Sequence, residues 1–319
     1  MPSQLKQLES MTTIVADSGD FESIKSFVPT DATTNPSLVF QAAQKREYRE
    51  LVEKAVALTQ KSAVSDKSAD LIDTLFVTFG IELLKIIPGR VSTEVDASLS
   101  FDTQATIDRA RHIIELYENH GIPRDRVLIK IAATWEGIRA CEMLEMENIH
   151  CNMTLIFSPV QAIGSMQAKA TLISPFVGRI LDWHKKQDPT AEYTLDTDPG
   201  VVAVRTIYNY AKKFGHTTQI MGASFRNTEE IRGLAGCDLL TISPKLLAEL
   251  NQATDPIEHK LSIENAQKSD IEKLTLSESS FRYLLNDNAM ATEKLAEGIR
   301  GFVKDTHKLE QFVCQEFNM

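Results

Sequence analysis

One lysine of this sequence stands inside an otherwise apolar segment. Residues 127 to 133 read Val-Leu-Ile-Lys-Ile-Ala-Ala, with Lys130 as the single charged residue. An apolar environment disfavours the ammonium form of a lysine, and a neutral amine can attack a ketone to form a Schiff base. The iminium then accepts electrons from a carbon–carbon bond that breaks beside it. The alternative is a structural role, in which Lys130 sits in a buried ion pair or extends its charged end to the surface.

Acidic and basic residues end other strand-like segments of the chain. Asp17 follows Thr-Ile-Val-Ala, and Glu94 lies within a run of strand formers. Arg179 and Arg226 follow two later segments. Carboxylates can move protons and a guanidinium can bind phosphate, so these types suit aldol cleavage of a phosphorylated substrate. Further polar residues near strand ends are Thr33, Asn35, Ser92, Asn152, Thr154, Ser174 and Ser224. Taken singly, a serine or threonine there more often caps a helix.

Eight strand-like segments recur, and helical patterns follow most of them. They are Thr13–Ala16, Asp31–Thr34, Val91–Val95, Val127–Ala132, His150–Ile156, Thr171–Pro175, Gln219–Ala223 and Leu239–Ser243. Apolar residues at spacings of three and four predict helices over Tyr48–Gln60 and Thr106–His120. This alternation predicts a (β/α)8 barrel, whose active site lies at the carboxyl ends of its strands. An open doubly wound sheet is the alternative, but the chain has neither a GxGxxG nor a P-loop pattern.

No linker or low-complexity tract divides the chain, so we expect residues 1–319 to form one domain. The polar stretch Asp188–Asp198 predicts a loop insertion, and Met1–Ser10 predicts a short surface helix. The tail after the eighth strand ends in an amphipathic stretch that runs from Leu295 to Val313. We expect this tail to pack across the barrel, near its mouth.

The composition limits the partners and the location of the protein. Lys and Arg number 34 against 44 Asp and Glu, a net charge of −10, and 43% of residues are hydrophobic. An acidic protein is repelled by nucleic acids and anionic membranes, so we expect neither as a partner. No apolar run is long enough to span a bilayer and no leader opens the chain, which favours the cytoplasm.

The cysteines and histidines do not predict a metal site. The four cysteines form no CxxC pair, and the seven histidines never come closer than eight residues in sequence. Metal-assisted aldol chemistry would need clustered histidines at strand ends. We therefore expect no metal and no cofactor.

Several segments of the chain resemble those of the transaldolase family. Two resemble its signature segments, namely Asp31-Ala-Thr-Thr-Asn-Pro-Ser-Leu-Val and Val127-Leu-Ile-Lys-Ile-Ala-Ala-Thr-Trp-Glu-Gly-Ile-Arg-Ala. Matching stretches begin at Gly89 (Gly-Arg-Val-Ser-Thr-Glu-Val-Asp), Cys151 (Cys-Asn-Met-Thr-Leu-Ile-Phe-Ser), Ile173 (Ile-Ser-Pro-Phe-Val-Gly-Arg-Ile-Leu-Asp-Trp) and Met221 (Met-Gly-Ala-Ser-Phe-Arg-Asn). The likeness runs from about Leu8 to the segment Lys294-Leu-Ala-Glu-Gly-Ile-Arg, which is nearly the whole chain.

The resemblance implies a class I aldolase-type barrel of the long, typically dimeric subfamily of the pentose phosphate pathway. Such an enzyme takes a phosphorylated ketose and a phosphorylated aldose as substrates. It would move a dihydroxyacetone unit from sedoheptulose 7-phosphate to glyceraldehyde 3-phosphate. The products would be erythrose 4-phosphate and fructose 6-phosphate.

The resemblance also implies roles for single residues. Lys130 matches the Schiff-base lysine, Asp17 the base at the C4 hydroxyl, and Glu94 an acid/base that acts through a water held with Thr154. The substrate-binding positions match Asn35, Asn152 and Ser174 for the dihydroxyacetone part, Arg179, Ser224 and Arg226 for the phosphate, and Phe176 beside the Schiff base. Thr33 and Ser92 are expected to line the same site.

Two other functions stay open from the sequence alone. A fructose-6-phosphate aldolase shares the lysine and the barrel but releases dihydroxyacetone to water. The chain length, the C-terminal tail and Phe176, where such aldolases tend to carry a tyrosine, favour the transferase. A non-catalytic sugar-phosphate binding protein is the other alternative, although binding alone needs no nucleophile.

Overall fold

Short apolar strands alternate with longer helices and close into a barrel of eight parallel strands, in sequence order. The computed structural model describes residues 2–27 and 29–317. Its strands are β1 (Thr13–Asp17), β2 (Asp31–Thr33), β3 (Val91–Glu94), β4 (Val127–Ala132), β5 (Cys151–Ile156), β6 (Leu172–Pro175), β7 (Gln219–Gly222) and β8 (Leu239–Ile242). All eight expected strands form, and their ends differ from the expectation by at most one residue. The predicted (β/α)8 barrel is confirmed, and the open doubly wound sheet is excluded.

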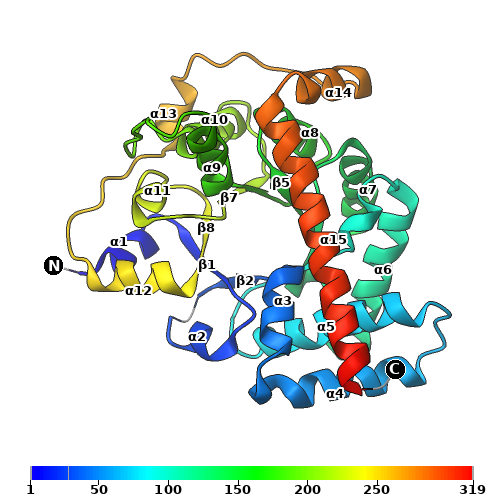
Figure 1. Ribbon diagram of the computed structural model, residues 1–319. Helices are drawn as coiled ribbons and strands as arrows, with labels where there is room; N and C mark the ends of the chain where they lie inside the picture. The colour runs from blue at the N-terminus through cyan, green and yellow to red at the C-terminus, as the bar shows by residue number, and fades with distance from the viewer. Residues whose placement is uncertain (1, 28, 318–319) are drawn as a thin grey trace.

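Helices cover the outside of the barrel and one end of it (Figure 1). They are α1 (Gln4–Glu9), α2 (Phe21–Lys25), α3 (Pro36–Ala43), α4 (Arg49–Lys61), α5 (Lys67–Leu84), α6 (Thr103–Asn119), α7 (Trp135–Met146), α8 (Pro159–Gln167), α9 (Val177–Gln187), α10 (Pro199–Lys213), α11 (Thr228–Arg232), α12 (Pro244–Gln252), α13 (Ile263–Gln267), α14 (Glu278–Asn286) and α15 (Ala289–Phe317), with short 3-10 helices at Arg46–Tyr48 (η1), Ala97–Leu99 (η2) and Arg124–Arg126 (η3). The helices expected over Tyr48–Gln60 and Thr106–His120 are α4 and α6, and the loop expected at residues 188–198 separates α9 from α10.

The expected N-terminal surface helix forms as α1, but it is more buried than its polar composition indicates. Leu5 and Leu8 are buried, and α1 packs against α12. Met1, where the predicted segment begins, lies outside the described residues. Within residues 2–27 and 29–317, no helix is both long and apolar enough to cross a membrane.

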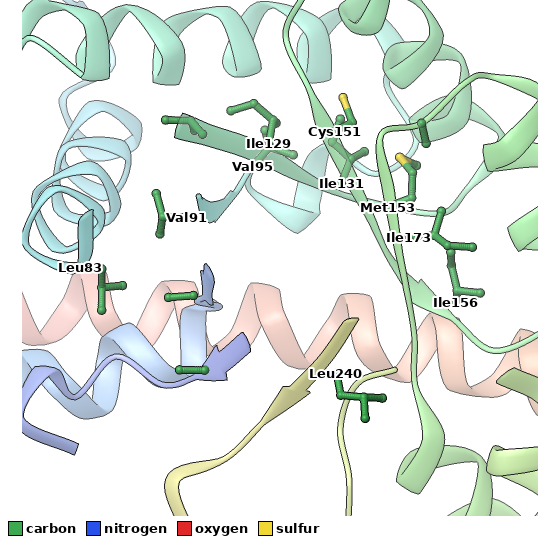
Figure 2. Close-up of a cluster of buried hydrophobic side chains, with 14 of the residues drawn as sticks. Leu83, Val91, Val95, Ile129, Ile131, Cys151, Met153, Ile156, Ile173 and Leu240 are labelled. Atoms are coloured by element: carbon green, nitrogen blue, oxygen red, sulfur yellow. The ribbon is translucent and has the colours of Figure 1, made fainter. Parts of the chain in front are cut away.

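Alternate side chains of each strand point into the barrel or outward, towards the helices that surround it. On β4, Val127, Ile129 and Ile131 point outward into the main hydrophobic core, as their spacing predicts. Figure 2 shows this core, in which Ile131 of β4 lies beside Met153 of β5, and Met153 lies beside Ile173 of β6. Inside the barrel, the lowest layer is a separate apolar cluster of Val15, Leu128, Leu172, Met221 and Leu239. This floor lies beneath the polar residues at the carboxyl ends of the strands.

The C-terminal helix α15 crosses the mouth of the barrel, as expected from its amphipathic pattern (Figure 1). Its apolar face joins residues that end several strands in a second interior cluster, which we call the cap cluster. The buried members of the cap cluster are Ala97, Ala132, Leu155, Phe157, Phe176, Ile180, Ala223, Ala291, Leu295, Ile299 and Phe302. The polar residues of the barrel therefore lie between an apolar floor and an apolar cover.

Two glycines provide a matched test of packing outside the site. Gly80 of α5 faces Tyr117, and an added Cβ would collide with the Tyr117 hydroxyl, which is hydrogen-bonded to Thr93 (2.6 Å). Overpacking of this kind destabilises proteins by about 1–3 kcal/mol, so Gly80→Ala should lower the free energy of unfolding by that amount. Gly301 of α15 is exposed and has no neighbour within 4 Å of its Cβ position. Gly301→Ala should raise stability by roughly 0.5–1 kcal/mol through helix propensity. Urea unfolding of both variants measures the difference, and equal effects would contradict this view of α5.

Candidate active site

Lys130 forms a buried pair with Glu94 near the carboxyl ends of two neighbouring strands. The two residues are register partners on β3 and β4, and the distance from Lys130 Nζ to Glu94 Oε2 is 3.1 Å. Both side chains are almost fully buried, and Lys130 Nζ also donates a hydrogen bond to the carbonyl oxygen of Thr34 (3.2 Å). Lys130 thus has the partner that a buried ammonium requires. Because that partner can itself take up or give a proton, the pair also suits a reactive amine.

Burial shifts the proton affinity of the carboxyl group in this pair. Desolvation raises the pKa of Glu94 above its ordinary range, and the positive charge of Lys130 opposes the rise. An acid/base whose pKa lies closer to neutral pH transfers protons more efficiently in both directions. Nearby, the hydroxyl of Thr154 is buried with no hydrogen-bond partner among the described residues. An orphaned hydroxyl at this depth needs a functional or structural reason, and a polar reactant beside Glu94 would provide one.

Asp17 provides a second carboxylate at the end of β1. Its Oδ1 accepts a hydrogen bond from the hydroxyl of Thr33 (3.0 Å), which in turn lies 2.9 Å from the hydroxyl of Thr241 on β8. Burial raises the pKa of Asp17, while the positive charge of Lys130 and the Thr33 hydrogen bond lower it. The network fixes the carboxylate and leaves its second oxygen available for a proton from a substrate hydroxyl.

Two serines, one from β3 and one from β6, hold the side-chain amide of Asn152 on β5 in a fixed orientation. Asn152 Nδ2 donates to Ser92 Oγ (3.0 Å), and its Oδ1 accepts from Ser174 Oγ (2.5 Å). Asn152 is also the register partner of Lys130 on β4. The amide is therefore held beside the amine by β3, β5 and β6. On the other side of the barrel, Asn35 caps α3, with its Oδ1 accepting from the backbone N–H of Leu38 (3.0 Å).

The two arginines lie at one edge of the barrel mouth. Burial and the nearby charge of Arg226 lower the pKa of Arg179, whose Cζ lies 5.1 Å from the ring centroid of Phe176. Arg226 is exposed and paired with Asp182 of α9, with 2.7 Å between Nη2 and Oδ2. Ser224 has a φ of 63°, in the left-handed region that non-glycine residues rarely adopt. A strained backbone beside two guanidinium groups is typical of a ligand-binding loop.

A cavity of about 90 Å³ joins these groups at the barrel mouth. Its lining residues are Asp17, Thr33, Asn35, Lys130, Ser174, Phe176, Arg179, Met221, Ala223, Ser224, Thr241 and Phe302. Eight of the thirteen residues expected from the sequence are therefore in its wall. The other five lie next to residues of the wall. Asn152 bonds to Ser174 and Ser92 bonds to Asn152, Glu94 pairs with Lys130, Thr154 lies on β5, and Arg226 bonds to Ser224.

Sequence reasoning missed four residues of this wall. Thr241 stands two residues after Leu239 in the expected eighth strand, so strict alternation would have found it, as it would Met221 and Ala223 on the seventh. Phe302 comes from α15, and no local pattern distinguishes it from the other apolar residues of that helix. Its place depends on where α15 crosses the barrel.

One group of side chains elsewhere could ligate a metal, among the residues that the structure describes. The Sγ atoms of Cys141 and Cys151 and a carboxylate oxygen of Glu145 lie within 4.8 Å of one another, at the amino end of β5. Glu145 already accepts hydrogen bonds from the backbone N–H groups of Cys151 (2.8 Å) and Thr171 (2.6 Å). Its carboxylate thus holds the starts of β5 and β6 together. The two cysteines are buried, as free cysteines commonly are.

Known proteins of one family match nearly the whole chain. The family described as Transaldolase/Fructose-6-phosphate aldolase matches residues 14–313. A "Probable transaldolase" of Drosophila melanogaster is 55% identical over 98% of this chain and 95% of its own length. A "Transaldolase" of Protochlamydia amoebophila is 57% identical over 97% of both chains. Among solved structures, an IMP dehydrogenase/GMP reductase-like protein from Corynebacterium glutamicum aligns with 74% of this chain and 64% of its own, at 12% identity and a TM-score of 0.40. That last likeness is too remote to bear on function.

Proposed function

This chain belongs to the transaldolase/fructose-6-phosphate aldolase family, and we propose that it carries a dihydroxyacetone unit as a Schiff base on Lys130. Its activity is that of a transaldolase, a transferase of aldehyde and ketone residues. The donor is sedoheptulose 7-phosphate and the acceptor is glyceraldehyde 3-phosphate. The observation that supports the covalent route is the buried pair of Lys130 and Glu94, 3.1 Å apart beside the cavity.

Formation of the Schiff base uses this pair. Transfer of the ammonium proton to Glu94 leaves a neutral amine, and the raised pKa of the buried Glu94 carboxyl favours this transfer. The Nζ lone pair attacks the ketone carbon, and the carbinolamine hydroxyl takes a proton and leaves as water. Glu94 is the proton donor for that step, through a water held by the Thr154 hydroxyl. In the reverse direction the same groups return water to the iminium carbon.

Cleavage uses the second carboxylate. Asp17 takes the proton of the C4 hydroxyl, the C3–C4 bond breaks, and its electron pair moves into the iminium to leave an enamine. The aldehyde fragment departs and an acceptor aldehyde takes its place. The enamine carbon then attacks the acceptor carbonyl, whose oxygen takes the proton back from Asp17. Asn35, Asn152 and Ser174 hold the hydroxyl groups of the three-carbon unit.

We assign the phosphate group to the edge of the mouth that carries Arg179, Ser224 and Arg226. Two guanidiniums meet there in a protein of net charge −10, close enough for the charge of Arg226 to lower the pKa of Arg179. Arginine binds phosphate through two parallel N–H donors. Asp182 holds Arg226 in place, with 2.7 Å between Nη2 and Oδ2.

Removing Arg226 should weaken binding of phosphorylated substrates selectively. We expect Arg226→Ala to lose about 1.5–3 kcal/mol in kcat/KM for fructose 6-phosphate, the value of a hydrogen bond to a charged group. Unphosphorylated fructose should lose much less. Asp182→Asn is the matched control, because it removes the ion-pair partner but keeps the guanidinium. Equal losses on both sugars would mean that Arg226 has a structural role instead.

One experiment tests the proposed function against its two alternatives. Borohydride reduction with fructose 6-phosphate, followed by mass spectrometry, should label the peptide that contains Lys130. A non-catalytic binding protein gives no adduct. Adding erythrose 4-phosphate should shift the products to sedoheptulose 7-phosphate, whereas a fructose-6-phosphate aldolase continues to release dihydroxyacetone. The apolar cover provided by Phe176 and α15 supports transfer over release.

Four further properties belong to the proposal: one domain, a homodimer, a cytoplasmic location and a reaction without a metal. The closed barrel and the return of α15 across it support one domain over residues 1–319. The family resemblance supports a homodimer, and the four free cysteines support a cytoplasmic location. Activity in the presence of EDTA would support a reaction without a metal. Light scattering of the purified protein tests the dimer.

A further inference from the structure

Helix α15 places an aromatic ring beside the proposed Schiff-base lysine. Phe302 is buried, lines the cavity, and has its ring centroid 5.6 Å from Lys130 Nζ. The same ring lies 5.7 Å from Cζ of Arg179, which also faces the ring of Phe176 at 5.1 Å. Phe302 therefore contacts the amine that would carry the sugar and the guanidinium at the phosphate end. It comes from outside the barrel strands and their loops.

A close contact between α15 and β5 fixes how deeply the Phe302 ring enters the mouth of the barrel. Gly298 lies one helical turn before Phe302, and a Cβ there would stand 2.7 Å from Cδ2 of Leu155. Leu155 has a φ of 54°, at the place where the register of β5 and β6 shifts. A strand irregularity of this kind re-aims a side chain, and here it directs Leu155 into the cap cluster. The strand segment that presents Thr154 therefore also seats α15.

Hydrogen bonds tie the other half of α15 to the helices around the mouth. Asp305 accepts a hydrogen bond from the hydroxyl of Ser37 on α3, and Glu310 accepts one from Ser68 on α5. Phe302 lies between the Gly298 contact and the Ser37 bond. The ring is thus held from both sides, and its position does not depend on its own contacts alone.

We propose that Phe302 decides whether the three-carbon unit is transferred or released, an inference that rests on the proposed Schiff-base function. After cleavage, the enamine on Lys130 has two fates. Its nucleophilic carbon bonds to the carbonyl carbon of an acceptor aldehyde, whose oxygen takes a proton. Alternatively, that carbon takes a proton from water, a second water adds to the iminium carbon, and the C–N bond breaks to give dihydroxyacetone and the free amine. A buried ring against the amine excludes water from this side of the cavity, and so favours the first fate.

The test is the ratio of release to transfer. Release is the rate at which fructose 6-phosphate alone yields glyceraldehyde 3-phosphate, and transfer is the rate of sedoheptulose 7-phosphate formation when erythrose 4-phosphate is added. Phe302→Ala should raise this ratio about tenfold, since a modest change in one barrier has an effect of that size. Phe302→Leu, which keeps an apolar side chain, should give an intermediate ratio. Gly298→Ala should raise the ratio with the ring still present, because it lifts α15 away from Leu155.

Phe312→Ala is the control for loosening of the helix. Phe312 lies on the same helix but packs against Phe40, at 6.3 Å between ring centroids, and does not line the cavity. An unchanged ratio in Phe302→Leu and in a folded Phe302→Ala, or an equal rise in Phe312→Ala, would overturn the inference. If Phe302→Ala does not fold, Phe302→Leu and Gly298→Ala decide the question. A different result would contradict the proposed function itself: the unmodified protein would then give no borohydride adduct and no transfer.

Discussion

Replacing Lys130 by methionine should abolish turnover of fructose 6-phosphate while leaving the barrel folded. Loss of a covalent nucleophile removes the whole route through the iminium, so we expect kcat to fall by roughly four orders of magnitude or more. Methionine is unbranched and fills nearly the same volume, so Phe302 and the strand neighbours of Lys130 should keep their packing. Steady-state assays and borohydride trapping measure the loss, and circular dichroism checks the fold.

Lys130→Met should also lose stability relative to the unmodified protein as the pH rises. Lys130 opposes the rise that burial imposes on the pKa of Glu94, so removing the ammonium raises that pKa further. A carboxyl group with a raised folded-state pKa favours the folded state when protonated. That contribution is complete below its ordinary value of 4.5 and is lost as the pH rises through the folded-state value. Lys130→Met should therefore be close to the unmodified protein in stability at acid pH and fall behind it towards neutral pH.

Two controls separate the nucleophile from a general effect of charge. Lys130→Met combined with Glu94→Gln removes the titrating group, so its stability should no longer fall with pH in this way. Lys85→Met removes an exposed lysine that pairs with Glu82 outside the barrel, and it should leave turnover unchanged. Substantial turnover by Lys130→Met, or a reduced adduct on Lys85 or Lys169, would mean that another amine carries the sugar.

The sequence predicts the strands well because each of them has a simple physical signature. Runs such as Val127–Ala132 are short, apolar and rich in branched residues, and the parallel arrangement buries both of their faces. The period of two then separates inward from outward positions, so Lys130 could be assigned to the interior beside an apolar outer face. The family resemblance added the roles of these residues, which composition and spacing do not contain.

Other features depend on tertiary contacts that no local pattern encodes. Leu155 adopts a left-handed conformation that its residue type disfavours, because the barrel and α15 together hold it there. Arg226 pairs with Asp182, which lies 44 residues earlier in the chain. Phe302 reaches the cavity only because of how closely α15 approaches the strands where it crosses the mouth. The amphipathic pattern predicted that α15 would cover the barrel, but it could not identify the residue that enters the site.

The two carboxylates of the site should fail at different stages when each is made neutral. Asp17→Asn places an amide in the hydrogen-bond network with Thr33 but removes the carboxylate that we propose as the base for the C4 hydroxyl. Imine formation should continue, so borohydride would trap the intact six-carbon sugar on Lys130. Glu94→Gln removes the acid/base beside the amine, so imine formation itself should slow and little adduct of any kind should form at short times. General acid–base groups contribute roughly 10²- to 10⁴-fold, and both losses should be far larger than assay error.

The quenched adducts, followed by mass spectrometry over time, distinguish the two stages. Glu94 lies 3.1 Å from Lys130 Nζ and outside the cavity wall, whereas Asp17 lines the wall, where we place the C4 hydroxyl of a bound ketose. Asp17→Glu is the matched control, because it restores a carboxylate at a shifted position and should recover part of the cleavage step. Accumulation of only the three-carbon adduct in Asp17→Asn would show that cleavage does not need Asp17. A six-carbon adduct that accumulates in Glu94→Gln would assign imine formation to another acid. Either result would mean that the carboxylates do not have the roles that we infer from their positions.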